Sequence, residues 1–102
     1  MSAGTVDRTI HEPARLRILM VLSATDAVEF NFLSSVLGLT KGNLSTHLDR
    51  LERAGYVAVS KSFRGKVPHT EYRLTASGRA ALAAYWAAID RIRGLETTPV
   101  RT

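Results

Sequence analysis

Basic side chains are concentrated in one third of the sequence, between residues 41 and 74. This segment holds seven lysines and arginines against three acidic residues, a net charge of +4, whereas the other 68 residues carry a net charge of +1. Lysine and arginine bind phosphates, and short polar side chains hydrogen-bond to base edges. Segregated basic charge of this kind is typical of a nucleic-acid-binding surface. The seven residues are Lys41, Arg50, Arg53, Lys61, Arg64, Lys66 and Arg73.

We expect DNA contacts from two groups of residues in this segment. The first lies on the outward face of a helix. There the free N–H groups of the first turn and a lysine suit a phosphate. Short polar side chains suit base edges, and an arginine is long enough to reach a guanine or a phosphate. The second lies at the tip of a hairpin, where basic residues contact phosphates or the minor groove. The first group is Lys41, Gly42, Asn43, Ser45, Thr46 and Arg50, and the second is Lys61, Arg64 and Lys66.

A pair of short helices positions the first group. Gly38 suits the left-handed conformation that ends a helix, and Thr40 is a good N-cap for the next helix, over 41–54. We expect Asn31 to cap the helix before the turn. This is the layout of a helix-turn-helix, although the spacing alone fits an ordinary helical hairpin equally well. The buried stripe of the second helix is Leu44, Leu48 and Leu51, which turns the first group outward.

A β-hairpin follows and positions the second group. Residues 56–59 and 71–74 are predicted strands, and 60–67 is the basic connection between them. With a first helix over 12–24 and a last helix over 76–94, the order is helix, helix, helix, hairpin, helix. We therefore predict a mainly α fold with a small β-hairpin wing, a winged helix-turn-helix with a long C-terminal helix.

The last predicted helix is apolar on nearly all its faces, and one small core cannot cover them all. We therefore expect it to join two copies in a homodimer, its alanines allowing close approach. A small-molecule pocket near the helix aromatics is the less favoured alternative to simple packing. The expected interface residues are Leu82, Tyr85, Trp86, Ile89 and Ile92.

Length and composition limit the remaining possibilities. A chain of 102 residues allows one domain, over 10–94, between flexible segments 1–9 and 95–102. The absence of cysteine excludes disulfides and thiolate metal sites. No apolar run is long enough for a membrane span and no signal peptide is visible, so we expect a cytoplasmic protein.

The three histidines give little support for catalysis. His11, His47 and His69 fall in three different predicted elements, with no acidic residue at triad or metal spacing around them. We therefore expect neither an enzyme nor a metal or cofactor site.

Four stretches together resemble small winged-helix transcriptional regulators, the ArsR-like and MarR-like broad class in its minimal single-domain bacterial and archaeal form. The resemblance covers about 10–93 and implies a homodimer whose recognition helices enter successive major grooves, with wings over the flanking backbone. It does not extend to metal sensing, because the Cys-x-Cys motif of the ArsR-like metal sensors is missing. The stretches are 11–19 (HEPARLRIL), 37–48 (LGLTKGNLSTHL), 51–57 (LERAGYV) and 74–80 (LTASGRA).

The function predicted from these features is sequence-specific recognition of double-stranded DNA by a transcriptional regulator. Two alternatives remain at this point, a winged-helix protein–protein interaction module and a non-specific DNA-binding protein. Binding to a random-sequence duplex at low salt discriminates between the module and the two DNA-binding functions.

Overall fold

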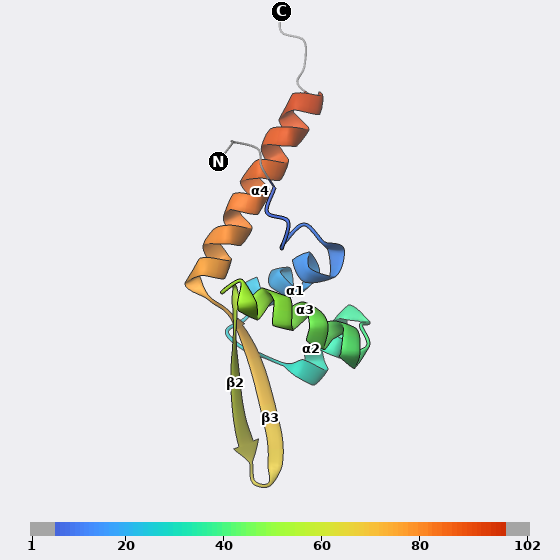
Figure 1. The fold of residues 1–102 in the computed structure, drawn as a ribbon, viewed down its shortest axis with the longest axis vertical. Coiled ribbons are helices and arrows are strands. Elements are labelled where there is room, and N and C mark those ends of the chain that lie inside the picture. The colour runs from blue at the N-terminus through green and yellow to red at the C-terminus, as the bar shows by residue number, and fades with distance from the viewer. Residues whose placement is uncertain (1–5, 98–102) are drawn as a thin grey trace, which may run out of the picture.

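The computed structural model describes residues 6–97, with side chains up to residue 94. Three helices, a hairpin and a long last helix follow one another along the chain (Figure 1), which confirms the predicted winged helix-turn-helix. Parts of the predicted flexible ends, 1–5 and 98–102, lie outside the described residues. The elements are α1 (Pro13–Ser23), β1 (Val28–Glu29), α2 (Phe30–Leu37), α3 (Lys41–Arg53), β2 (Val57–Arg64), β3 (Val67–Leu74) and α4 (Ala76–Thr97).

The turn between α2 and α3 is built as predicted. Gly38 has a φ of 65°, which a residue without a Cβ adopts at little cost. The side-chain oxygen of Thr40 accepts a hydrogen bond of 3.1 Å from the backbone N–H of Asn43, so Thr40 caps α3. At the end of α2, the carbonyl oxygen of Leu37 accepts a hydrogen bond of 2.9 Å from the Arg17 guanidinium of α1. This contact ties the end of α2 to α1.

The start of α2 differs from the prediction. The helix begins at Phe30, before Asn31, and Glu29 is its N-cap residue without a capping hydrogen bond from its side chain. Pairing of β1 with β3 places Glu29 opposite Glu71, and the Glu29 carboxylate lies 2.8 Å from Nδ1 of His69. A strand pair between distant parts of the chain therefore decides where the helix starts.

The hairpin is longer and more regular than predicted. β2 and β3 pair without interruption from Val57 opposite Leu74 to Arg64 opposite Val67, so the predicted connection 60–67 is mostly strand. Only two residues form the turn, and the φ of 64° at Gly65, with no positive φ at the next residue, fits a type II′ turn. The sheet order is β1-β3-β2, but β1 pairs only near Tyr72, which leaves the outer edge open where Pro68 lies.

A single core holds these elements together. The predicted stripe of α3 is confirmed, since its three leucines are at most 2% exposed. Burial of side chains of this size stabilises the fold by roughly 1.5–3 kcal/mol each. Because this stripe is anchored, the opposite face of α3 is turned to solvent. The fully buried side chains are Ile10, Ile18, Leu19, Leu22, Leu33, Leu44, Leu48 and Leu51.

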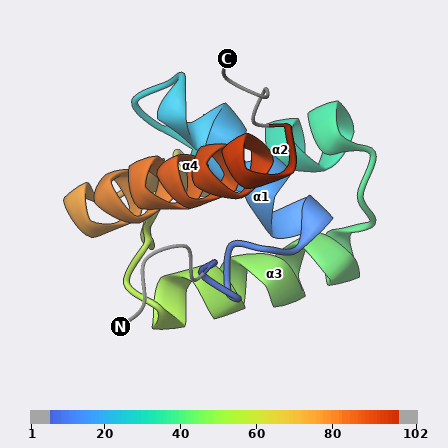
Figure 2. The ribbon, with the colours of Figure 1, turned by 90° about the horizontal axis from the view of Figure 1, so that it is seen from above.

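The N-terminal segment lies between α4 and α3 (Figure 2). The Asp7 carboxylate accepts hydrogen bonds from the backbone N–H of Thr9 at 2.9 Å and from the hydroxyl of Tyr56 at 2.5 Å. Nδ1 of His11 lies 2.9 Å from the hydroxyl of Tyr85 in α4. These contacts hold the described part of the segment 1–9, which we expected to be flexible, against the body of the domain.

Candidate nucleic-acid interface

The outward face of α3 carries the whole first group of predicted contact residues. All six side chains or backbone positions are exposed, and five of the six lie in the first half of the helix. That half is the part of a recognition helix that approaches base edges. The structure therefore brings together Lys41, Gly42, Asn43, Ser45, Thr46 and Arg50 on one surface.

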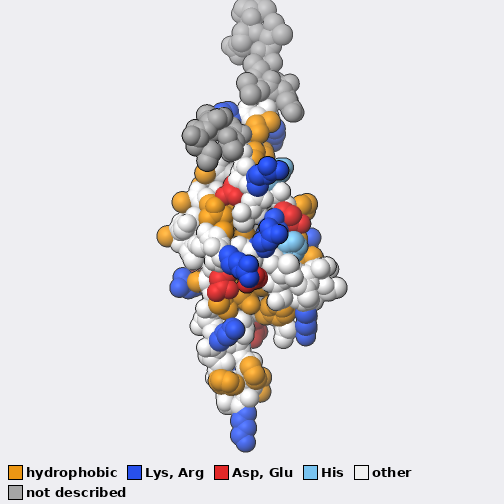
Figure 3. Space-filling model, viewed as in Figure 1, with side chains coloured by type: hydrophobic (Ala, Val, Ile, Leu, Met, Phe, Trp, Pro, Cys, Tyr) orange, Lys and Arg blue, Asp and Glu red, His pale blue; other side chains and the backbone are white. Residues whose placement is uncertain are grey.

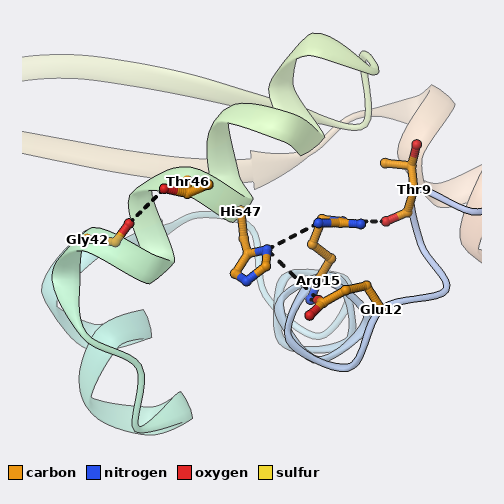
Figure 4. Close-up of polar contacts among 6 residues, drawn as sticks. All are labelled: Thr9, Glu12, Arg15, Gly42, Thr46 and His47. Atoms are coloured by element: carbon orange, nitrogen blue, oxygen red, sulfur yellow. Dashed lines mark hydrogen bonds and ion pairs between the residues drawn. The ribbon is translucent and has the colours of Figure 1, made fainter.

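Local hydrogen bonds limit what some of these groups can do. The hydroxyl of Thr46 donates to the backbone oxygen of Gly42 at 3.0 Å (Figure 4), so its free lone pairs are acceptors for a base amino group. Arg53 is paired with Asp49 at 3.1 Å. No described residue forms an ion pair or hydrogen bond with the Arg50 side chain, which leaves its guanidinium available for a partner outside the domain.

A groove separates α3 from the hairpin. Its walls are formed by Ser45, Asp49 and Glu52 of α3 and by Lys61 and Tyr72 of the hairpin. Burial raises the pKa of the Tyr72 hydroxyl, and the nearby Glu52 carboxylate adds to this effect, so this tyrosine stays a neutral donor. Because Lys61 and Ser45 line the same groove, Lys61 lies beside the outward face of α3.

The three predicted wing cations do not share one face. Lys61 lies on the side of the hairpin that faces α3, and Lys66 lies in the turn. Arg64 lies on the other side, where its guanidinium is 3.2 Å from Nε2 of His69. Basic side chains are nevertheless spread over the visible face of the molecule, from α4 across α3 to the end of the hairpin (Figure 3).

His69 is buried beneath Arg64 in a polar cluster that sequence reasoning did not find. Its Nδ1 lies 2.8 Å from Glu29 in β1, and its Nε2 lies 3.0 Å from Glu71 in β3. This cluster joins the hairpin to β1. No local signal reveals it, because Glu29 and His69 are 40 positions apart in the chain.

A second polar cluster supports α3 from behind (Figure 4). Arg15 of α1 donates through Nε to the backbone oxygen of Thr9 at 2.6 Å and through a terminal nitrogen to Nδ1 of His47 at 3.2 Å. Glu12 accepts a hydrogen bond from the backbone N–H of Arg15 at 2.7 Å and lies 3.9 Å from His47. Arg15 therefore positions α3, a role that its place in the sequence did not indicate.

The five expected interface residues of α4 fall into three environments. Leu82 and Tyr85 are 6% and 5% exposed and pack within the protomer's own core. Ile89 and Ile92 are half-buried. Trp86 is 39% exposed and lies among exposed alanines, so it is the large apolar side chain of α4 that a partner could cover.

The described residues contain no group of three or more histidine, cysteine or acidic side chains placed to hold a metal ion. None of the helices over 6–97 is both long enough and apolar enough to cross a membrane.

Comparison with known proteins gives a consistent picture. The family model described as a winged helix DNA-binding domain matches residues 14–93. An uncharacterised protein of Methanocaldococcus jannaschii is 42% identical over 72 residues, which cover 70% of this chain and 77% of that protein. An uncharacterised HTH-type transcriptional regulator of Mycobacterium tuberculosis is 44% identical over 54 residues, 53% of this chain and 47% of that protein.

Solved structures extend the similarity to nearly the whole domain. A transcriptional regulator homologue from Pyrococcus horikoshii superposes with a TM-score of 0.80 at 30% identity, over 87% of this chain and 89% of that one. The structure of a Mycobacterium tuberculosis protein superposes with a TM-score of 0.72 at 28% identity, over 87% and 86%.

Proposed function

Because the chain belongs to the family of winged helix DNA-binding domains, we propose that it is a transcriptional regulator that binds a specific double-stranded DNA sequence as a homodimer. In this proposal α3 enters the major groove and the hairpin follows the flanking backbone and minor groove. The residues that contact DNA are the six outward residues of α3 together with Lys61 and Lys66. Arg64 also contacts DNA in this proposal, either after its guanidinium breaks the contact with His69 or from the opposite side of the hairpin.

One observation carries this proposal. The first half of α3 presents only short polar groups, a lysine and bare backbone to solvent, directly beside a hairpin whose residues 61–70 hold three cations and no acidic residue. Short hydrogen-bonding groups suit base edges, and an acid-free basic arm suits phosphates. A protein-binding face would be expected to carry apolar anchors at its centre, and the outward face of α3 carries none.

The homodimer rests on α4. Its second half extends past the other helices (Figure 1), and Trp86 and the alanines at 80, 83, 84 and 87 are exposed in the preceding turns of the helix and at its middle. Alanines let two helices approach closely, and an exposed tryptophan supplies the packing volume at such an interface. Two copies joined along α4 would place their recognition helices one helical turn of DNA apart, or a multiple of it, about 10 base pairs.

The proposal is tested by measuring the anisotropy of labelled duplexes at several salt concentrations. One duplex is recovered by selection from a random-sequence pool and the other is random. We expect the selected duplex to bind at least about a thousandfold more tightly and to contain two half-sites. Asn43→Ala should reduce this preference, whereas Met20→Ala, which removes an exposed side chain of α1 that is not among the proposed contact residues, should leave it unchanged.

Two results would contradict the proposal. Equal affinity for the selected and the random duplex would indicate a non-specific DNA-binding protein. No binding to either duplex at low salt, where phosphate contacts are strongest, would indicate a protein–protein interaction module.

A further inference from the structure

The end of the hairpin carries an apolar patch that the phosphate contacts do not explain. Phe63 is 72% exposed and pairs directly with Pro68 across the ladder, so the two side chains lie on the same face. We call Phe63 and Pro68 the tip patch. Figure 3 shows hydrophobic side chains gathered near the end of the hairpin, with basic side chains above and below them.

The tip patch lies on the face of the hairpin that looks toward α3. Lys61 lines the groove between α3 and the hairpin, and Phe63 is two residues further along an uninterrupted strand, hence on the same side. Val67, which is 65% exposed, pairs with Arg64 and points to the opposite side. Phe63 thus continues the surface that begins with the outward residues of α3.

The backbone holds Phe63 in place. The ladder is paired to its last position, Arg64 opposite Val67, and the turn beyond it has only two residues. An aromatic side chain on an ordered ladder loses little conformational entropy on binding, compared with the same side chain on a longer loop. The tip patch is therefore a preformed contact.

We propose that Phe63 is an apolar wedge of the wing, which enters the minor groove beside the site of α3 and contacts sugars and a base step there. The charge of the tip favours DNA as the partner, because Lys61 lies on the same face as Phe63, Lys66 lies in the adjacent turn, and residues 61–70 include no acid. Apolar side chains flanked by cations unstack and bend DNA from the minor groove in other architectures. The inference rests on the proposed DNA-binding function and adds to it a contact that is not electrostatic.

The test compares Phe63→Ala, Val67→Ala and Lys66→Ala on the selected duplex, with anisotropy measured against salt. Phe63→Ala should weaken binding about tenfold or more with an unchanged salt slope, because no phosphate contact is lost. Val67→Ala, the matched control on the opposite face, should bind like the unchanged protein. Lys66→Ala should lower the slope by about one. Phe63→Leu, which keeps an apolar wedge, should recover part of the loss.

A second readout reports the base step itself. With 2-aminopurine placed in the flanking minor-groove segment, the unchanged protein should raise its fluorescence by unstacking it, and Phe63→Ala should not. Normal affinity and normal fluorescence for Phe63→Ala would overturn the wedge while Lys66→Ala still supports DNA binding. A changed sedimentation coefficient of free Phe63→Ala would assign the tip patch to a second copy and also overturn the wedge. Failure of the unchanged protein to bind any duplex would instead reject the proposed function.

Discussion

Arg50 and Arg53 stand one turn apart in α3, but only Arg53 is paired, with Asp49 at 3.1 Å. We predict that Arg50→Ala weakens binding to the selected duplex by about 1–3 kcal/mol and relaxes the preference at one base pair. Arg53→Ala is the control, and an exposed pair such as this one contributes little to stability or binding. Anisotropy titrations with single-base variants of the duplex measure both effects. A loss that is equal at every base would show that Arg50 binds a phosphate.

Tyr56 has a pKa that depends on its contact with the N-terminal segment. The hydrogen bond to Asp7 raises the pKa of Tyr56 to about 12, with burial and the charge of Asp7 adding to the effect. In the unfolded chain the pKa is close to 10, so the unfolded state releases its proton first. The contribution to stability is complete below pH 10 and is lost as the pH rises through about 12.

The measurement for Tyr56 is urea unfolding between pH 9 and pH 12, combined with ultraviolet titration of the tyrosines. We expect the free energy of unfolding to fall over this range and the absorbance to show late titration of Tyr56, together with Tyr72, whose pKa is also raised by burial. Tyr56→Phe should remove the part of the late absorbance change that belongs to Tyr56 and make the fall in stability less steep. The same slope in Tyr56→Phe as in the unchanged protein would show that other groups cause the alkaline loss.

The junction between β2 and α4 is packed around Gly78. A Cβ at this position would collide with the backbone carbonyl group of Tyr56 and lie 2.8 Å from the Leu74 side chain. That carbonyl is fixed, because it accepts a hydrogen bond of 3.0 Å from the backbone N–H of Thr75. We predict that Gly78→Ala lowers the free energy of unfolding by about 1–3 kcal/mol, the range for overpacking, as measured by urea denaturation.

The control for Gly78 is Gly42, which is also helical but has open space around an added Cβ. Gly42→Ala should leave stability unchanged or raise it by up to about 1 kcal/mol, because alanine favours the helix. If both variants lose the same stability, the cause is a general effect of replacing glycine in a helix and not the contact with Tyr56.

Elements defined by local chemistry were predicted from the sequence. The left-handed Gly38, the capping Thr40 and the leucine stripe of α3 act over three or four residues, so their pattern is visible in the chain itself. The outward face of α3 follows directly from that stripe. The first group of predicted contact residues, whose placement depends only on this stripe, accordingly lies on one exposed surface.

Features that depend on distant partners were not predicted. The strand β1 has only two residues, and its pairing with β3 moves the start of α2 to Phe30. The sequence has no apolar alternation over Ser60–Arg64, yet the hairpin extends through these residues. The cross-strand ladder and a tight turn at Gly65 stabilise it there. The support of His47 by Arg15 likewise joins residues 32 positions apart.

In the whole molecule, the N-terminal segment connects α4 with α3. His11 forms a hydrogen bond with Tyr85 of α4, and Asp7 accepts one from Tyr56 just after α3. The backbone oxygen of Thr9 accepts a hydrogen bond from Arg15, which also donates to His47 within α3. The position of α4 and that of α3 are therefore fixed by the same short stretch of chain. A dimer built on α4 would transmit its geometry to the spacing of two recognition helices through these contacts.

That dimer is the last prediction, and Trp86 decides it. Trp86→Ala should weaken self-association by about 2 kcal/mol or more, the cost of losing a central aromatic anchor, and sedimentation velocity over a range of concentrations measures it. Phe32→Ala is the matched control, because Phe32 is an aromatic residue of α2 with 51% exposure. The weakened dimer should also lose affinity for a duplex with two half-sites more than for one half-site, since only a dimer occupies both. A monomeric unchanged protein at every concentration would reject the homodimer, and a dimer unaffected by Trp86→Ala would place its interface elsewhere on the domain.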